Sequence, residues 1–344
     1  MQRQTVLAIA TALISAAVSC CVFVAGDIYF AYWSASRPDP YVQMSNVHIQ
    51  DYVLGWRPIP GALGRHAETG SFDVEYRMDE NGFKATPERG LPTLRIYFFG
   101  DSYTFGHGVP NVDTYPNIIA DKYLNNSIHV LNAGVMGYGI EQMYGYFLEI
   151  VGQLRLGDIV VFAPTSQDIK RNLKDFVYPA KLIFAERFAR RYTYYEDGRL
   201  SSVELATPWN TFKAFMLNGR LTKNIFRFLH RTLTRPNTTQ EAVEMLSAIR
   251  ALTEQRGAQF ALFFLPQTKE RLRGKYEEDL SAFTFFDVMN FFPSEAAELA
   301  KIRFKTDTHW NRAGHAIAAR AIVETLVQEG FIDNRVLQSG QPSP

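Results

Sequence analysis

The stretch LRIYFFGDSYTFGHG, residues 94–108, decides the fold of this chain. Its first seven residues are mostly apolar and end at Gly100, which predicts a short strand buried in a sheet. Gly, Asp and Ser follow directly, and these residue types favour a tight turn. A strand that ends in such a turn places Ser102 at the carboxyl end of the sheet, with its hydroxyl at the mouth of the sheet.

Strands and helices alternate along the chain after this turn. Further strands are predicted at 128–134, 158–164, 258–266 and 285–289, and helices at 116–124, 140–154, 239–256 and 312–329. The last two helices stop at Gly257 and Gly330, and glycine is a common residue at a helix end. Such alternation predicts an α/β fold, in which helices cover both faces of a parallel sheet.

Residues 171–236 do not follow this alternation. The segment is rich in aromatic and basic residues and is too long for a plain connection, since loops of this length are usually functional or disordered. We interpret it as an inserted helical lid or substrate-binding segment. Arg190 and Arg191, among several tyrosines, are candidates to bind a substrate, although a solvated helix face is the simpler interpretation.

The first 36 residues differ in composition from the rest of the chain. The run TVLAIATALISAAVSCCVFVAG, residues 5–26, carries no charge and is close to the ~20 residues that span a hydrocarbon core. Arg3 precedes it, and an aromatic group follows it, which is typical of an interfacial belt: Tyr29, Phe30, Tyr32 and Trp33. We predict an uncleaved single-pass anchor in a bacterial inner membrane, with the catalytic domain in the periplasm or outside the cell. A cleaved signal peptide, or a lipoprotein signal ending before Cys20, is the alternative.

Composition sets limits on the remaining residues. The chain has 344 residues, of which 47% are hydrophobic and 21% charged, and its net charge is +1. Nucleic-acid binding depends on clustered Lys and Arg, so no nucleic-acid partner is expected. The cysteines, Cys20 and Cys21, both lie in the apolar run, which excludes a disulfide framework elsewhere. Residues 37–90 are interpreted as a lead-in region with short strands, 91–335 as the main domain and 336–344 as a tail.

A second polar segment, TDTHWNRAGH at residues 306–315, opens the last helix. A serine hydroxyl is a poor nucleophile until an oriented base takes its proton. Asp307 and His309 could supply the orienting carboxylate and the base for Ser102. The simpler alternative is a surface loop with Asn311 as a helix cap. His315 has no partner in the sequence, so a packing role is expected for it.

Three other polar residues near these segments are weaker candidates. Asp101 is expected to fix the turn before Ser102, and Asn132 to support the turn after the second strand. His107 lies in a glycine-rich loop, where a role in the site and a role on the surface are equally supported.

Taken together, the two segments resemble the SGNH hydrolase family, also called GDSL-type esterases and lipases, over residues 91–330. Gly-Asp-Ser at 100–102 matches the family's first block, Gly137 in NAGVMGYG its oxyanion-hole glycine, and Asp307 with His309 its last block. The resemblance implies a flavodoxin-like three-layer sandwich with a five-stranded parallel sheet. It also implies a triad of Ser102, His309 and Asp307 that needs no metal and no cofactor.

The sequence departs from the family pattern at two places. The third block normally ends Gly-x-Asn-Asp, but here it is TSQDI, so that Gln167 takes the place of the asparagine, followed by Asp168. The resemblance then implies an oxyanion hole formed by the N–H groups of Ser102 and Gly137 and the amide of Gln167. The aspartate stands two residues before the histidine where many members have three. This DTHW form resembles a variant seen among alginate-type O-acetyltransferases and some bacterial esterases of this class, which raises the transferase possibility without deciding it.

Three functions remain in competition at this stage. The first is a serine-dependent ester hydrolase acting on acylated glycan or lipid at the cell envelope. The second is an O-acyltransferase that moves acetyl groups onto an envelope polysaccharide, together with polysaccharide-processing partners. The third is a catalytically impaired glycan-binding or scaffold protein, which Gln167 favours and the retained Ser, Asp and His oppose.

Overall fold

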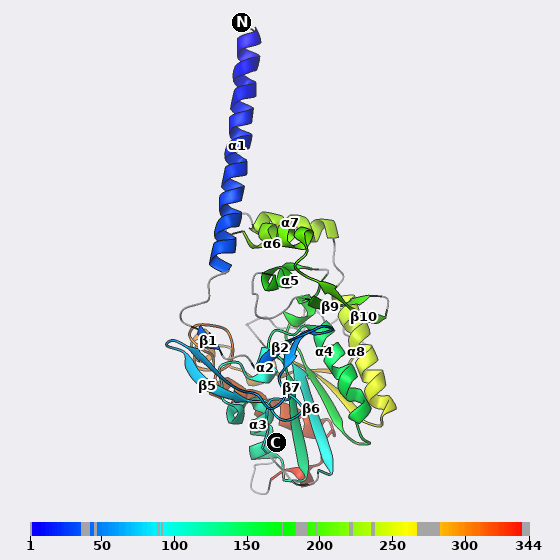
Figure 1. The fold of residues 1–344 in the computed structure, drawn as a ribbon. Helices are drawn as coiled ribbons and strands as arrows, with labels where there is room; N and C mark the ends of the chain where they lie inside the picture. Colours follow the sequence, from blue (N-terminus) through cyan, green and yellow to red (C-terminus); the bar gives the residue numbers. More distant parts are fainter. Residues whose placement is uncertain are drawn as a thin grey trace.

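A computed structural model describes residues 2–35, 42–44, 47–87, 90, 92–173, 175–183, 191–196, 198–219, 223–234, 238–266 and 283–338. Arg190 and residues 339–344 of the tail lie outside this described part. Figure 1 shows one long helix, α1, projecting from a compact body that holds the remaining elements.

Five parallel strands form the central sheet of the body. They are β6 (Leu94–Gly100), β7 (Ile128–Gly134), β8 (Ile159–Ala163), β11 (Gln259–Phe264) and β12 (Phe285–Asp287). Their order is β12-β11-β8-β6-β7, and every neighbouring pair is parallel. Numbered along the chain, this is the order 2-1-3-4-5 of flavodoxin-like sheets. The expected fold class is therefore confirmed.

Helices cover both faces of this sheet. On one face lie α4 (Ile140–Ile150) and α8 (Thr238–Gln255), and on the other α3 (Tyr115–Ile118) and α11 (Arg312–Gln328). Alternate residues of β6 enter different cores: Tyr97 and Phe99 belong to one, and Ile96 and Phe98 to the other. Side chains of a strand alternate between the two faces of its sheet, so a continuous apolar run is what a sheet between two helical layers requires.

Short helical elements complete the main domain. They are α2 (Ser102–Phe105), η1 (Asn111–Asp113), η2 (Ile119–Tyr123), η3 (Val151–Gln153), η4 (Asp168–Lys170), η5 (Val288–Phe291), α10 (Ala296–Lys301) and η6 (Asn334–Val336). The helix predicted at 116–124 is divided, because α3 is followed by the π-helical turn η2.

The lead-in region forms two small antiparallel sheets. One contains β1 (Val42–Met44), β4 (Leu63–Glu68) and β5 (Phe72–Arg77), and the other β2 (His48–Asp51) and β3 (Gly55–Pro58). The region packs on the main domain: the Lys84 N–H donates to the carbonyl of Asn132 at 3.0 Å, and the indole of Trp56 donates to the carbonyl of Met136 at 3.0 Å. The lead-in region therefore packs against β7 and the loop that follows it.

The segment 171–236 is only partly helical. It contains α5 (Val177–Leu182), α6 (Pro208–Asn218) and α7 (Lys223–Thr234), and between α5 and α6 a hairpin of β9 (Arg191–Glu196) and β10 (Arg199–Glu204). The segment was expected as an inserted helical lid or substrate-binding segment, and this hairpin was not predicted. RYTYYE and RLSSVE are rich in strand-forming residues and flank Asp-Gly, a strong hairpin signal, and Gly198 has φ +77°.

The N-terminal helix α1 (Gln2–Ala35) carries the apolar run. Its segment Gln4–Asp27 has 24 residues with a mean hydropathy of 2.4, long and apolar enough to cross a membrane. This property rests on length and composition alone, and a signal sequence near the N-terminus shares it.

Candidate active site

Ser102 stands where β6 gives way to α2. It is the first residue of that helix, and the carboxylate of Asp101 caps the helix by accepting the Tyr103 N–H at 2.8 Å. A side chain at Gly100 would collide with Thr104, so the turn needs glycine there. At the first position of a helix the backbone N–H of Ser102 has no acceptor within the helix. Asp101 thus fixes the turn, as expected.

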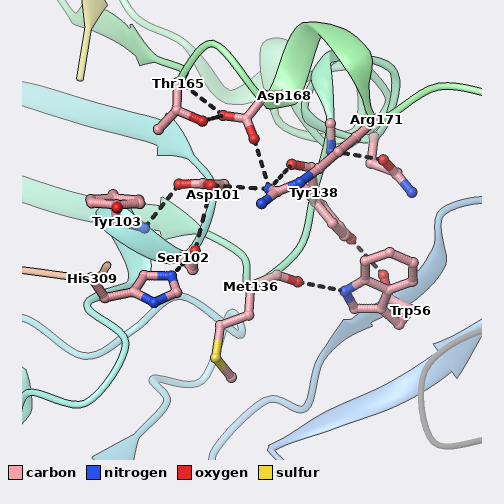
Figure 2. A network of polar contacts seen from close by, with 12 residues as sticks. Trp56, Asp101, Ser102, Tyr103, Met136, Tyr138, Thr165, Asp168, Arg171 and His309 are labelled. Atoms are coloured by element: carbon pink, nitrogen blue, oxygen red, sulfur yellow. Dashed lines mark hydrogen bonds and ion pairs between the residues drawn. The ribbon is translucent and has the colours of Figure 1, made fainter. Parts of the chain in front are cut away.

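Ser102, His309 and Asp307 form a continuous hydrogen-bonded chain. The Ser102 hydroxyl lies 2.7 Å from His309 Nε2, and His309 Nδ1 lies 2.9 Å from Asp307 Oδ2. Asp307 Oδ1 also accepts the backbone N–H of His309 at 2.8 Å. Figure 2 shows the imidazole of His309 facing the Ser102 hydroxyl beside the ring of Tyr103. This is the arrangement of a nucleophile, its base and the group that orients the base.

Two contacts hold the loop of His309 against α2. The hydroxyl of Tyr103 donates to the carbonyl of Thr308 at 2.9 Å, and the ring of Tyr103 packs on that of His309 with the centroids 4.9 Å apart. Asn311 caps α11 by accepting the N–H groups of its first turn. The Asn311 cap expected of a surface loop and the contact of His309 with Ser102 therefore occur in the same segment.

His107 is a second histidine in contact with Asp307. The sequence supported a role in the site and a role on the surface equally. Nε2 of His107 lies 3.2 Å from Asp307 Oδ2, and its ring stacks on that of His309 with the centroids 4.2 Å apart. Burial lowers the pKa of His107, which favours the neutral ring. Burial alone would raise the pKa of Asp307, but hydrogen bonds from His107 and His309 outweigh it and keep the carboxyl ionised.

The loop of His107 is held from the lead-in region. The buried ammonium of Lys84 donates to the carbonyls of Gly106 and Val109 at 3.1 and 3.3 Å, and burial lowers its pKa. The hydroxyl of Tyr76 in β5 accepts the N–H of Gly108 at 2.8 Å. Residues 47–87 therefore position a side chain of the site, which nothing in their local sequence indicated.

Gly137, the expected oxyanion-hole glycine, lies in a loop fixed on both sides. Its φ is +80°, a conformation that costs glycine little, and a Cβ there would collide with the Tyr178 hydroxyl. Trp56 donates its indole N–H to the carbonyl of Met136 at 3.0 Å and accepts the Tyr138 hydroxyl at 2.5 Å on its own carbonyl. Figure 2 shows Met136 and Tyr138 reaching Trp56 from this loop.

A buried ion cluster joins the carboxyl ends of three strands. Arg171 donates to Asp101 at 3.0 Å, to Asp168 at 2.7 Å and to the carbonyl of Tyr138 at 3.1 Å (Figure 2). Asp168 also accepts the N–H and hydroxyl of Thr165 at 2.7 and 3.0 Å. Burial alone would lower the pKa of Arg171, but Asp168 and Asp101 raise it, so the guanidinium stays charged. The cluster ties the nucleophile turn to the loops after β7 and β8.

Gln167, the expected third oxyanion donor, is exposed in this structure. It precedes η4 and accepts the Lys170 N–H at 2.9 Å on its carbonyl. Among the described residues the structure gives its side chain no hydrogen bond, whereas the next residue, Asp168, is buried in the ion cluster. The geometry brings together Ser102, His309 and Asp307 without Gln167, so its role remains a prediction.

Replacement of Gln167 by alanine tests that role. If its amide turns toward the oxyanion when a substrate binds, Gln167→Ala will lower kcat by about 10²–10³ with little change in KM, the usual effect of losing one oxyanion donor. Ser166→Ala, at the neighbouring position, is the control and should leave kcat unchanged. An unchanged kcat in Gln167→Ala would remove this residue from the oxyanion hole.

Two minor expectations are met. Nδ1 of the buried His315 lies 3.3 Å from the N–H of Tyr115, and its ring contacts that of Trp310. Burial lowers its pKa to about 3, so it packs as a neutral ring. Asn132 donates to the carbonyl of Thr104 at 3.0 Å and accepts the N–H of Gly134 at 3.1 Å, and thereby joins the turns after β6 and β7.

The ligand atoms of His107, Asp307 and His309 lie within 4.8 Å of one another, a spacing that could hold a metal ion. Asp307 and His309 are also the residues that extend the hydrogen-bonded contacts from Ser102.

Comparison with solved structures gives several matches of low sequence identity. A protein assigned to the G-D-S-L lipolytic family from Desulfitobacterium hafniense has 14% identity and a TM-score of 0.35, with 66% of this chain and 98% of that chain covered. A member of the same family from Veillonella parvula has 13% identity and a TM-score of 0.30, with 69% and 100% covered. A protein named TesA has 12% identity and a TM-score of 0.39, with 69% and 99% covered.

No protein-family model and no curated protein matches the chain. Two of the three solved structures named above are described as members of the G-D-S-L lipolytic family. At such identities the activities of these proteins do not transfer to this chain.

Proposed function

We propose that this chain is a serine-dependent ester hydrolase that acts on an acylated glycan or lipid at the cell envelope. The observation that carries the proposal is the chain of contacts from Ser102 to His309 and on to Asp307, at 2.7 and 2.9 Å. A serine at a strand end with both an aligned base and an orienting carboxylate suits acyl transfer.

In the proposed reaction, neutral His309 takes the proton of Ser102 while the serine oxygen attacks the ester carbonyl. Asp307 holds the ring in the required tautomer and stabilises the imidazolium that forms. The N–H groups of Ser102 and Gly137 are the proposed oxyanion donors, with Gln167 as a third. His309 then protonates the leaving alcohol, and a water molecule, activated by the same histidine, releases the acid from the serine.

An O-acyltransferase is the second candidate, because the triad would serve it equally. In that reaction a sugar hydroxyl replaces water in the second step and carries the acyl group away from Ser102. The DTHW form at Asp307–Trp310 favours this candidate through its resemblance to alginate-type O-acetyltransferases. An impaired glycan-binding or scaffold protein is the third candidate, and the exposed side chain of Gln167 favours it.

An assay of the purified full-length chain in detergent, on a short-chain aryl ester, distinguishes these candidates. A hydrolase releases alcohol and free acid at equal rates, with Ser102→Ala as the blank. A transferase releases alcohol faster when a sugar acceptor is added and forms the acylated sugar. Absence of alcohol release on a series of acyl chain lengths, from a folded sample, would contradict both enzymatic candidates.

For the location we propose a single-pass anchor in a bacterial inner membrane, with the catalytic domain in the periplasm. The apolar segment Gln4–Asp27 and Arg3 before it support this orientation, since positive charge favours the cytoplasmic side. A C-terminal alkaline phosphatase fusion, active only after export, should be active. An active cytoplasm-only reporter at the same position would contradict the orientation.

A further inference from the structure

Helix α7 exposes its apolar side chains. Four large apolar residues are far more exposed than is usual in a helix of a folded domain: Ile225 at 61%, Phe228 at 70%, Leu229 at 45% and Leu233 at 81%. Phe228 and Leu229 follow Ile225 by three and four residues, and Leu233 follows Leu229 by four, which places all of them along one face of the helix. That face forms a contiguous apolar strip of the kind that marks an interaction site.

The polar face of α7 is the one that packs on the protein. Arg231 makes two hydrogen bonds to the carboxylate of Asp175, at 2.8 and 2.9 Å. Nε2 of His230 lies 2.9 Å from the Asp175 carbonyl, and Arg227 donates to the Leu217 carbonyl at 2.9 Å. A surface helix ordinarily turns its apolar stripe to the core and its polar face to water. Here most of the apolar side chains face outward, and the helix is held by these polar contacts and by Phe226, which packs partly buried on the core.

Helix α6 extends the apolar surface. Trp209 and Phe212, both exposed, stack with their ring centroids 5.8 Å apart. Tryptophan is enriched where one side of a residue meets lipid and the other meets water. The exposed apolar side chains of α6 and α7 named here are called the α6–α7 face below.

The position of α1 indicates what covers the α6–α7 face. Residues 4–23 of α1 are all exposed, whereas Val24 is half-buried and Asp27 is buried. Helix α1 contacts α6. Twenty-four residues of α-helix measure about 36 Å, slightly more than the ~30 Å hydrocarbon core. The contact therefore lies at the end of the apolar segment, at the level of a membrane surface.

Figure 1 shows α7 lying across the direction of α1, beside the lower part of that helix. A helix that lies in the plane of a membrane has this orientation relative to one that crosses it, and it buries its apolar face at the boundary between headgroups and acyl chains.

We propose that the α6–α7 face docks on the surface of the lipid bilayer that α1 crosses. The proposal depends on α1 being a membrane span and is independent of the catalytic activity. Docking at α6 and α7 adds a second attachment to the anchor, and so sets the orientation of the body on the membrane. The same insert supplies Arg171 and Tyr178, which contact the loops at Ser102 and Gly137, so the site is held at a defined distance from the lipid.

The test places a fluorophore on the full-length chain in phosphatidylcholine nanodiscs that hold one copy each. Cys20→Ser and Cys21→Ser leave a single introduced cysteine, which carries an environment-sensitive nitrobenzoxadiazole group. Phe228→Cys and Trp209→Cys report on the α6–α7 face. Leu156→Cys is the matched control, because Leu156 is also large, apolar and exposed but precedes β8, at the opposite edge of the sheet from Ser102.

At positions 228 and 209 we expect blue-shifted emission, which lipids with a nitroxide near the headgroup quench. At position 156 we expect water-like emission without quenching. Water-like emission at 228 and 209 would overturn the proposal. A blue shift without quenching by the nitroxide lipid would also overturn it, and so would a blue shift that appears only in discs with two copies. In either case a protein surface, and not lipid, would cover the α6–α7 face.

Discussion

Ser102→Ala is expected to reduce ester hydrolysis by about 10⁶ in kcat, the size of the loss when a serine nucleophile is removed. The Ser102 hydroxyl is the oxygen in contact with His309 Nε2, at 2.7 Å, and alanine leaves the base without a proton to take. KM should change little, because alanine removes only the reacting oxygen. Steady-state kinetics on an aryl ester measure the effect.

The double variant Ser102→Ala with His309→Ala should be no slower than either single one, since nucleophile and base act as a unit and their losses do not add. Ser166→Ala, a serine at the same edge of the sheet, is the control for substitution as such. Near-normal hydrolysis by Ser102→Ala would refute the proposed nucleophile, and with it the esterase and transferase candidates alike.

Asp307→Asn is expected to reduce kcat by about 10⁴, as when the aspartate of a serine triad becomes an amide. Asp307 Oδ2 now accepts from His309 Nδ1 at 2.9 Å, which leaves Nε2 free to take the serine proton. An asparagine amide facing Nδ1 would instead donate, and the ring would carry its hydrogen on Nε2, the wrong atom for a base.

The neighbouring His107 makes this result sensitive to the hydrogen-bond pattern. His107 also contacts Asp307, at 3.2 Å, so the asparagine oxygen could turn to either histidine. His107→Phe keeps a ring stacked on His309 and removes the contact with the carboxylate. Its kcat should fall by less than that of Asp307→Asn. Asp333→Asn, at an exposed ion pair, is the control. An unaltered kcat in Asp307→Asn would show that Asp307 does not orient the base.

Most of the main sheet could be predicted because its determinants are local. Apolar runs bounded by Gly and polar residues predicted β6 and β7 at the residues where they occur, and β8 to within one residue at each end. The hairpin of β9 and β10 was missed, although Asp-Gly between two strand-forming runs is a strong signal. The segment had been interpreted from its length and its aromatic and basic composition, without use of this turn signal.

The Ser102, His309 and Asp307 contacts also follow from local features combined with one rule of topology. Strands of a parallel sheet end at one edge, so a serine after β6 and a histidine before α11 can meet across 207 residues of chain. The Gln167 assignment depended on the position of a family block alone. Side-chain direction is not encoded in such a position, and the structure has Gln167 exposed.

The sequence by itself determined where β6, β7 and β8 lie, the turn that holds Ser102 and the Asp-x-His loop, since periodicity, glycine and turn residues act over a few neighbours. The flavodoxin-like sheet was expected from the family resemblance alone, and the structure gave the strand order. Only the tertiary structure decided which groups support these elements. Trp56 reaches Met136 across 80 residues and Arg171 reaches Asp101 across 70, and no local pattern specifies such partners. The orientation of α7 also depends on a long-range contact, because Arg231 and Asp175 pair across 56 residues.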